Sequence, residues 1–451
     1  MKKIFTICLV SLLLACGNEE PKIDYALFSG KIENPTGEVV TIYKGRDMVK
    51  EITLNDDNTF ADTLKIEKGY YTLNHGREGS AIYLVPGDSI QLTLNTEEFD
   101  ETLTYTGLGS ENCNFLAKKF INEEQMDIDI PKIYSMEETE FLAMMDEIKS
   151  SKLEFLNAAK SIDPEFRILE EKAIEYEHLS NLIRYPDYHK YFTKKEEFSV
   201  SNDFNNRISG IDLTNEEDYK NIENYKVLVL NSYSNDIRKS DSPKDVFDKI
   251  SSEVSQTVKD DIAENLAYDV NLNNEHHDAF YKGIMAMSTD SLLKANLTTK
   301  YEKLQNLALG MPSPKFFDYE NHKGGTTSLD DLKGKYVYVD VWATWCGPCI
   351  REIPSLKEVE KEFHDKNIEF VSMSIDRMTD HDKWVAMVND KELGGTQIMA
   401  DKDWKSDFVQ GYAIEGIPRF ILIDPNGNIV SADAPRPSNP KLKELFNAQD
   451  I

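Results

Sequence analysis

The pattern of apolar and polar residues divides the chain into three stretches. Between residues 24 and 108, short runs of alternating polarity recur, and turn-forming segments at residues 55–58 and 86–88 separate them. Short alternating runs bounded by Asn, Asp, Gly and Pro are typical of β-strands joined by turns. We therefore expect an all-β, sandwich-like domain over residues 24–108.

The second stretch, residues 111–305, has the apolar spacing of helices. Residues 141–148 and 254–268 repeat apolar side chains at helical intervals, which predicts amphipathic helices that bury one face. Glycines are few, and breaks are expected near Pro186 and Pro243, because proline interrupts the hydrogen bonding of a helix. The middle region is therefore predicted to be mostly α-helical.

Residues 306–451 combine both patterns around a pair of cysteines. Residues 336–342 are apolar and β-branched, which predicts a buried strand, and residues 350–359 continue with helical spacing. Where a strand turns into a helix, the unpaired N–H groups and the positive end of the helix dipole stabilise a thiolate. We therefore expect Cys346 to point outward as the nucleophile and Cys349, one turn inside the helix, to be the resolving thiol.

The cysteine pair has two other interpretations, half of a zinc site and a purely structural disulfide. A Cys-x-x-Cys pair also forms half of a zinc site, but structural zinc needs four ligands. The other cysteines are Cys8 and Cys16 near the N-terminus and the isolated Cys113, and no second Cys-x-x-Cys or His-x₃₋₅-His pair is present. A redox pair is therefore favoured over a metal site and over a purely structural disulfide. Cys113 is expected to be a small buried residue.

The N-terminus predicts export and a lipid anchor. Two lysines precede an apolar run at residues 4–15, which is too short to span the roughly 30 Å core of a bilayer as a helix. The pattern is typical of a cleaved signal peptide over residues 1–15. Leu-Leu-Ala-Cys at residues 13–16 resembles a bacterial lipobox, so we expect Cys16 to carry lipid and residues 16–23 to form a tether. A plain secretory signal is the alternative.

These signals predict a location in a bacterial cell envelope. An anchor that faces the periplasm is favoured, and the acidic residues after Cys16 leave the outer membrane or the cell surface open. The formal net charge of −29 argues against nucleic-acid binding, which needs a basic surface, and against adsorption to anionic lipids. No other segment approaches 18 consecutive apolar residues, so membrane attachment is expected through the lipid anchor alone.

The surroundings of the cysteine pair resemble a known family. The run DVWATWCGPC at residues 340–349 is similar to the active-site segment of thioredoxins. Its continuation is similar to the TlpA/ResA branch, bacterial envelope thiol–disulfide oxidoreductases that carry a Glu and a Pro where this chain has Glu352 and Pro354. Gly-Ile-Pro at residues 416–418, before an apolar strand, matches the cis-proline loop of that branch. The resemblance covers residues 306–451 and implies a thioredoxin-like α/β domain.

The resemblance implies a role for each matched residue. Cys346 would attack a substrate disulfide, and Cys349 would resolve the mixed disulfide. Asp340 and Glu352 both match acids that move protons at this site, and which of them is the base stays open. A cis peptide bond before Pro418 would leave the backbone of Ile417 available to an extended substrate. The other positions expected to meet substrate are Trp345, Gly347 and Pro348. Trp342 and Trp345 are expected to pack at the rim of the site, with a place in the core as the alternative for each.

Three functions are compatible with the sequence. The leading expectation is a lipid-anchored reductase of disulfides in envelope proteins, because the Gly-Pro between the cysteines matches reducing thioredoxin. The family implies a membrane electron donor of the DsbD/CcdA type and no cofactor beyond the Cys346–Cys349 disulfide. A thiol peroxidase is the second, although Val339 and Ala343 stand where such enzymes carry Pro and Thr. The third is a non-enzymatic binding lipoprotein with a vestigial last domain, which the intact set of cysteines, acids and Pro418 disfavours. Residues 83–88 resemble an N-terminal domain that precedes TlpA-like domains in Bacteroidetes lipoproteins, and we expect the β domain to be a spacer or a docking module.

Overall fold

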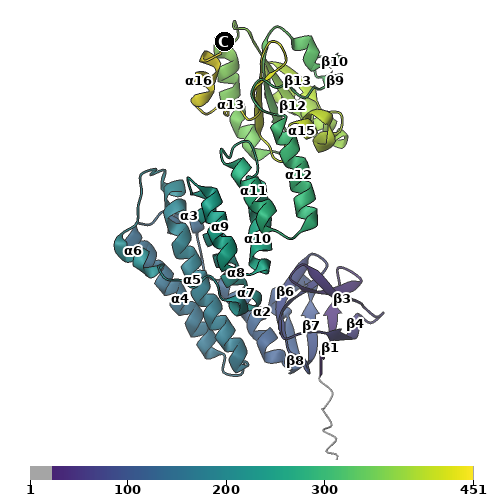
Figure 1. The fold of residues 1–451 in the computed structure, drawn as a ribbon. Helices are drawn as coiled ribbons and strands as arrows, with labels where there is room; N and C mark the ends of the chain where they lie inside the picture. Colours follow the sequence, from purple (N-terminus) through teal and green to yellow (C-terminus); the bar gives the residue numbers. More distant parts are fainter. Residues whose placement is uncertain (1–22, 450) are drawn as a thin grey trace, which may run out of the picture. The chain divides into compact units, whose positions relative to one another are not determined.

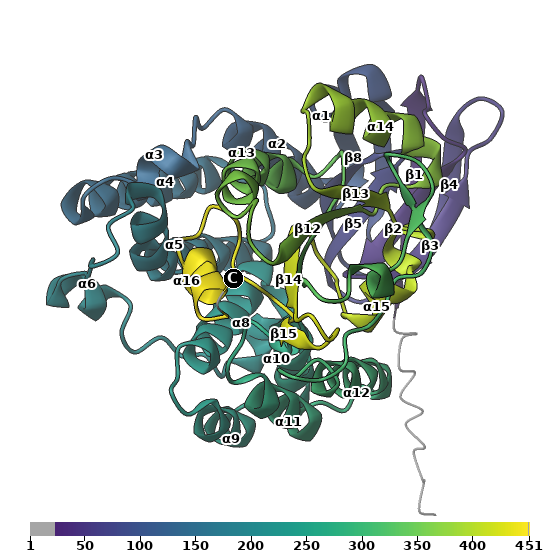
Figure 2. The ribbon, with the colours of Figure 1, turned by 90° about the horizontal axis from the view of Figure 1, so that it is seen from above.

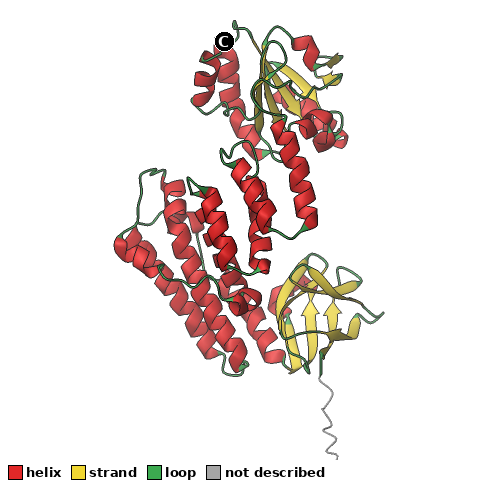
Figure 3. Ribbon diagram, in the orientation of Figure 1, coloured by secondary structure: helices red, strands yellow, loops and turns green. Residues whose placement is uncertain are grey.

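The computed structural model describes residues 23–449 and residue 451. The expectations for the signal peptide, for the tether up to residue 22 and for lipidation of Cys16 lie outside these residues. The chain divides between Ser232 and Tyr233 into two units. The first unit begins with β-strands and continues with helices, and the second begins with helices and continues with a second group of strands that has helices of its own (Figures 1 and 3). The domain boundaries expected from the sequence stay predictions.

The first unit begins with two four-stranded sheets, of order β4-β1-β7-β8 and β3-β2-β5-β6. Every second residue of β1 is buried, and so are Ile90, Leu92 and Leu94 of β7. These inner faces share one apolar core with the second sheet, which confirms the predicted sheet-rich N-terminal region. The strands are β1 (Tyr25–Glu33), β2 (Val39–Lys44), β3 (Asp47–Thr53), β4 (Thr59–Lys65), β5 (Gly69–His75), β6 (Glu78–Leu84), β7 (Ser89–Asn95) and β8 (Thr104–Leu108).

The middle region is helical, as predicted, but one expected break is absent. Pro186 lies inside α5 (Pro164–Thr193), which continues past it. Tyr185 is fully buried, its ring stacks on Phe141, and its hydroxyl donates to the carbonyl of Met136 at 2.8 Å, so packing offsets the lost helical hydrogen bond. The other helices that begin in this unit are α1 (Phe99–Thr102), α2 (Ser110–Glu124), α3 (Ile130–Tyr134), α4 (Glu138–Ala158), α6 (Asn202–Arg207), α7 (Glu216–Asn221) and α8 (Glu223–Arg238).

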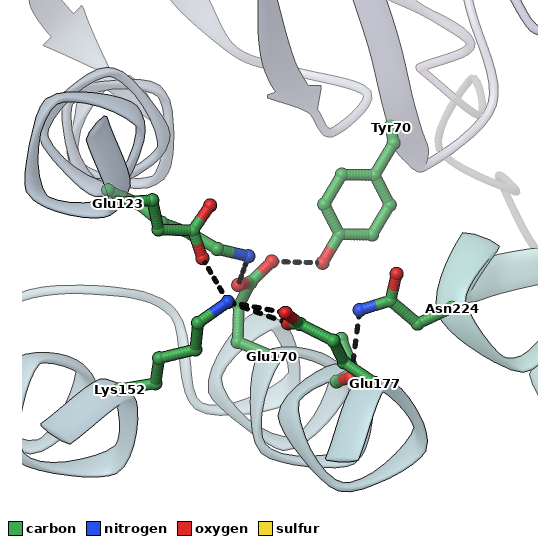
Figure 4. A network of polar contacts seen from close by, with 8 residues as sticks. Tyr70, Glu123, Lys152, Glu170, Glu177 and Asn224 are labelled. Carbon is green, nitrogen blue, oxygen red and sulfur yellow. Dashed lines mark hydrogen bonds and ion pairs between the residues drawn. The ribbon is translucent and has the colours of Figure 1, made fainter. Parts of the chain in front are cut away.

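A buried polar network joins the sheet to the helices within the first unit (Figure 4). Glu170 of α5 is 2% exposed, and it accepts a hydrogen bond from the hydroxyl of Tyr70 on β5 at 2.6 Å. Its other carboxylate oxygen lies 2.8 Å from Nζ of Lys119 on α2. A carboxylate is costly to bury unless it is paired and hydrogen-bonded, so these contacts hold β5, α2 and α5 in one arrangement. The network continues through Lys152, Glu123 and Glu177.

The second unit contains a mixed sheet of order β10-β9-β13-β12-β11-β14-β15. The interior strand β11 (Tyr336–Trp342) runs parallel to β12 and antiparallel to β14, and it is buried from Val337 onward. Helices α13 and α16 lie side by side on one face, where Leu356, Phe446 and Tyr338 share a core, and α15 lies on the other (Figures 1 and 2). This arrangement confirms the predicted α/β class of the C-terminal region.

The remaining elements of this sheet and its helices have the following bounds. The strands are β9 (Tyr319–Asn321), β10 (Thr326–Thr327), β12 (Ile368–Ser374), β13 (Thr396–Met399), β14 (Arg419–Ile423) and β15 (Ile429–Ser431). The helices are α13 (Gly347–Glu362), α14 (His381–Asp390), α15 (Asp407–Gly411) and α16 (Lys441–Asn447).

Four helices precede the sheet in the second unit, namely α9 (Pro243–Glu253), α10 (Gln256–Leu266), α11 (His277–Met287) and α12 (Ser291–Gln305). Pro243 is the first residue of α9, so the break predicted there is confirmed. The chain after α12 joins the sheet directly, because Gly310 donates a backbone hydrogen bond to Ile429 and Ile429 donates one to Met311, both at 2.8 Å. In the part of the chain that the structure describes, none of the helices is long and apolar enough to cross a membrane.

Candidate active site

The two cysteines lie where the buried strand β11 is followed by helix α13. Cys346 is the N-cap of α13, and its Sγ accepts a hydrogen bond from the backbone N of Cys349 at 3.1 Å. The two residues form a disulfide with their Cα atoms 5.3 Å apart. The sulfur of Cys346 therefore lies against the first-turn N–H groups at the positive end of the helix, as the sequence predicts.

The exposure of Cys346 differs from the expectation of an outward-pointing sulfur. Cys346 is 4% exposed, the same as Cys349, because the disulfide turns its sulfur toward the first turn of α13. The exposed surface around the disulfide is formed instead by Trp345, which is 57% exposed, and by Gly347 and Pro348. In the oxidised protein a substrate would meet these three residues before it met either sulfur.

Of the two tryptophans expected at the rim, only Trp345 lies there. Its ring lies 6.4 Å from the ring of Trp404, measured between centroids. Trp342 is 2% exposed, because it is the last residue of an interior strand that is covered on both faces. For Trp342 the alternative of a core position therefore holds, and the residue lines a small cavity behind Cys349.

Asp340 lies on β11 behind the disulfide. It is 9% exposed and lines that same cavity together with Cys349 and Glu360 of α13. Burial, followed by the negative charges of Glu360 and Glu352, raises the pKa of Asp340 to about 8. A carboxyl group with such a pKa exchanges its proton close to neutral pH, which is the property that a proton acceptor for Cys349 needs.

Glu352 has a different environment. It follows Cys349 by about one helical turn, and its carboxylate accepts hydrogen bonds from the backbone N and the Oγ of Ser438, at 3.0 and 2.9 Å. It lies outside the lining of the cavity that Asp340 shares with Cys349. With both of its oxygens engaged, Glu352 ties α13 to the segment that leads into α16.

A second buried acid near the site, Asp376, was missed by the sequence analysis. It is fully buried just after β12 and accepts hydrogen bonds from the backbone N and the Oγ1 of Thr344, at 2.9 and 2.7 Å, and from Oγ of Ser374 at 2.7 Å. These bonds hold the segment that carries Cys346 two residues later. The signal that could have identified Asp376 is an acid placed directly after an apolar strand.

The loop before β14 brings the predicted proline to the same edge of the sheet. The peptide bond between Ile417 and Pro418 is cis, as predicted. Arg419 pairs with Val341 across β14 and β11, so Pro418 lies level with the end of β11, where the cysteine segment begins. Ile417 and Pro418 are both half-buried, which leaves part of this loop open to a ligand.

Residues from outside the sheet support this loop. Nζ of Lys300 on α12 lies 2.6 Å from the carboxylate of Glu415 and 5.5 Å from the centre of the Tyr268 ring. Tyr268 is 68% exposed, and its hydroxyl would lie 3.8 Å from a Cβ atom at Gly416. The helices that precede the sheet therefore contribute to the surface next to Ile417.

Metal ligation and the remaining described cysteine are the other chemical features that the sequence raises. Among the described residues, no group of three or more His, Cys, Asp or Glu side chains is arranged to hold a metal ion. Cys113 is fully buried in the first unit and donates to the carbonyl of Tyr83 at 3.4 Å. Its full burial confirms the expectation of a small buried residue, and burial raises the pKa of its thiol to about 12.

Comparisons with known proteins agree with this geometry. The Redoxin family model matches residues 308–448, which include Asp340, both cysteines and Pro418. The thiol-disulfide oxidoreductase ResA of Bacillus thuringiensis strain Al Hakam is 30% identical over 129 residues, which are 29% of this chain and 69% of the relative. ResA of Bacillus thuringiensis subsp. konkukian is 27% identical over 148 residues, which are 33% of this chain and 80% of the relative.

Among solved structures, the chain is similar to the thioredoxin domain of a thiol-disulfide oxidoreductase from Bacteroides vulgatus. The two are 33% identical, and the match covers 32% of this chain and 98% of that one with a TM-score of 0.28. The family model places the relationship in residues 308–448, the redoxin domain. The chain belongs to the ResA/TlpA-like thiol–disulfide oxidoreductases of the thioredoxin superfamily.

Proposed function

We propose that the protein is a lipid-anchored enzyme of the bacterial envelope that reduces disulfides in other proteins by dithiol–disulfide exchange. The observation that carries the proposal is the Cys346–Cys349 disulfide at the N-terminus of α13. The hydrogen bond from the Cys349 backbone N to the Cys346 sulfur would stabilise a thiolate once the disulfide is reduced, and the thiolate is the nucleophile of disulfide exchange.

The exchange proceeds in two displacements. In the reduced protein, the Cys346 thiolate attacks one sulfur of the substrate disulfide, so that a mixed disulfide forms and the first substrate thiolate leaves. Cys349 then gives its proton to a base and attacks the sulfur of Cys346. The mixed disulfide breaks, the second substrate thiolate leaves, and both substrate thiolates take up protons. Two electrons have then passed to the substrate, and the Cys346–Cys349 disulfide has formed.

Asp340 is the base for Cys349 in this scheme. It shares a cavity with Cys349, and its raised pKa of about 8 lets it change protonation state near neutral pH. The carboxylate of Glu352 is occupied by Ser438 and lies outside that cavity. Glu352 acts in this scheme as a structural tie whose charge helps to raise the pKa of Asp340.

Substrate recognition is assigned to the exposed rim. Trp345, Gly347 and Pro348 surround the disulfide, and Ile417, a half-buried residue, would offer backbone hydrogen bonds to an extended segment of the substrate. Proteins that contain disulfides in the envelope are the proposed substrates. Electrons would return to the oxidised site from a membrane reductase of the DsbD/CcdA type. Anchoring through lipid on Cys16, with the site facing the periplasm, would place the protein beside such a donor.

A trapping experiment tests the proposed function. Reduced Cys349→Ser protein should accumulate a mixed disulfide with an unfolded disulfide-containing protein, because nothing resolves the bond on Cys346. Cys346→Ser protein, the matched control, should form none. The wild-type couple, equilibrated in thiol–disulfide buffers, should have a potential near the value of about −270 mV of thioredoxin. No reversible couple, or turnover of peroxide without protein disulfides, would overturn the proposal.

A further inference from the structure

We propose that Glu360 relays protons between the buried pair Asp340–Cys349 and solvent. The inference rests on the proposed function, because a relay matters only if Cys349 gains and loses a proton in each catalytic cycle. Glu360 lies on α13 about three helical turns beyond Cys349, and it acts on the sulfur only through Asp340. Glu360 does not touch the reacting sulfur, so it is a positioning residue that acts through Asp340 and not a catalytic residue.

One internal cavity connects Cys349 with Glu360. Asp340 of β11 and Ser372 of β12 line it together with these two residues. The cavity measures about 10 Å³ for a water-sized sphere, which is room for about one water molecule. Lys357, an exposed residue, also lines it, so the lining reaches from the buried Cys349 to a residue at the protein surface.

A buried amide in the cavity wall supports a water molecule at this place. Gln397 of β13 is 3% exposed, and its Nε2 donates to the carbonyl of Gly394 at 2.7 Å. Its Oε1 has no hydrogen-bond partner among the described residues. A buried acceptor costs free energy unless it receives a hydrogen bond. A water in the cavity would donate to it and would bridge to the carboxyl groups alongside.

Two glycines make room for the carboxyl group of Glu360. A Cβ atom at Gly394 would clash with Oε2 of Glu360, and a Cβ atom at Gly395 would lie 3.2 Å from Oε1. Gly395 has a φ angle of +60°, a left-handed conformation that glycine adopts without strain. The turn at residues 394–395 therefore lets the carboxyl group lie directly against backbone at the cavity.

The charged groups that face Glu360 do not fix it in its ionised form. Lys357 on its own helix and Lys323 in the β9–β10 turn both donate to backbone carbonyl groups, at 3.0 and 3.2 Å. Glu369 of β12 faces it with negative charge, and the carboxyl group of Asp340 on β11 lines the same cavity. Burial is the largest influence and raises the pKa of Glu360 to about 7, with the lysines opposing this rise and Glu369 adding to it.

The relay moves one proton in each direction per cycle. When Cys349 attacks the mixed disulfide, its S–H bond breaks and the proton passes to the carboxylate of Asp340. From Asp340 the proton moves through the cavity water to Glu360, which releases it at the surface beside Lys357. When the disulfide is reduced again, the same path runs inward and delivers a proton to the Cys349 thiolate. Because the two carboxyl groups repel each other when both are ionised, one proton shared between them is favoured.

Single-turnover kinetics of the full chain test the relay. The reduced protein is mixed with a disulfide substrate in weak buffer across pH 5–9, and formation of the Cys346–Cys349 disulfide is followed by tryptophan fluorescence. Glu360→Gln should slow the resolution step about tenfold at pH 7, part of the 10²–10⁴-fold that acid–base catalysis contributes. The pH profile of this rate should shift to lower pH in Glu360→Gln, because the variant lacks the negative charge of Glu360 that raises the pKa of Asp340. Added formate should restore the rate, and Glu360→Asp should be intermediate.

Glu358→Gln, an exposed position on the same helix, is the matched control and should behave as the wild type. A merely structural role of Glu360 would lower the Tm without a shift in pH profile and without rescue by formate, and that result overturns the relay. If Glu360→Gln does not fold, carbon-13 NMR of the wild type decides: a Glu360 titration near 7 supports the relay, and one near 4.5 overturns it. If the wild type exchanges no disulfides, the proposed function fails. If the wild type exchanges disulfides and Glu360→Gln resolves the mixed disulfide at the wild-type rate, only the relay fails.

Discussion

Replacing Asp340 with Asn is expected to make the folded redoxin domain more stable at neutral pH. The folded state holds the pKa of Asp340 near 8 instead of 3.8. Between these values the folded protein keeps a proton that the unfolded chain has released, so wild-type stability falls as the pH rises. This destabilising contribution is absent below about pH 4 and complete above about pH 8. One pKa unit corresponds to about 1.4 kcal/mol, so at pH 7 the contribution is at most about 4 kcal/mol.

The chain offers a selective probe for this measurement. All four tryptophans lie between residues 342 and 404, so tryptophan fluorescence during urea unfolding reports on the redoxin domain and not on the first unit. Oxidised wild type and Asp340→Asn should have similar free energies of unfolding at pH 4. At pH 7 the variant should be more stable by about 2–4 kcal/mol, because asparagine keeps the shape of the neutral acid without its ionisation. Resolution by Cys349 should slow about 100-fold in the same variant.

If wild type and Asp340→Asn lose stability in parallel between pH 4 and pH 8, the carboxyl group is not held neutral by burial. Glu358→Gln serves as the control, since this exposed residue should leave the difference between pH 4 and pH 7 unchanged. A variant that is less stable at every pH would show that Asn cannot occupy the cavity wall, and it would also count against a neutral acid there.

Three further substitutions follow from the same contacts. Asp376→Ala should destabilise the redoxin domain by about 3 kcal/mol in the fluorescence assay, because the buried hydroxyl of Ser374 and two donors of the half-buried Thr344 lose their acceptor. A loss under about 1 kcal/mol would contradict the anchoring role of Asp376. Glu352→Gln should leave the rate of resolution within about twofold of wild type, because its carboxylate serves Ser438; a loss as large as that of Asp340→Asn would reverse their roles. Glu170→Gln should destabilise the first unit by about 3 kcal/mol, measured by far-ultraviolet circular dichroism, and an unchanged transition would refute the importance of the buried ion pair.

The predictions that held depend on residues close together in sequence. Alternating polarity identified the strands of residues 24–108, and helical spacing identified the middle region, because each pattern needs only a few neighbouring side chains. The position of Cys346 at the start of a helix follows from the apolar run before it and the helical run after it. The cis bond at Pro418 followed from a resemblance in sequence.

The predictions that failed depend on packing. Pro186 was expected to end a helix, but contacts of Tyr185 with α4 and with the carbonyl of Met136 stabilise the helix across it. For Trp342 the rim position fails and the core position holds, because residues on β11 alternate between two covered faces and the strand is buried on both. Neither outcome can be read from a local pattern, since each is decided by elements that come from elsewhere in the chain.

The sequence by itself determined the class of each region, the cysteine pair and the candidate acids, because these are properties of residue type and local spacing. Only the tertiary structure distinguished between the acids. Asp340, Glu360 and Gln397 are far apart along the chain but line one cavity, whereas Glu352, close to Cys349 in sequence, is turned toward Ser438. The proton affinity of a carboxyl group depends on its burial and on nearby charges in space, and folding alone brings those together.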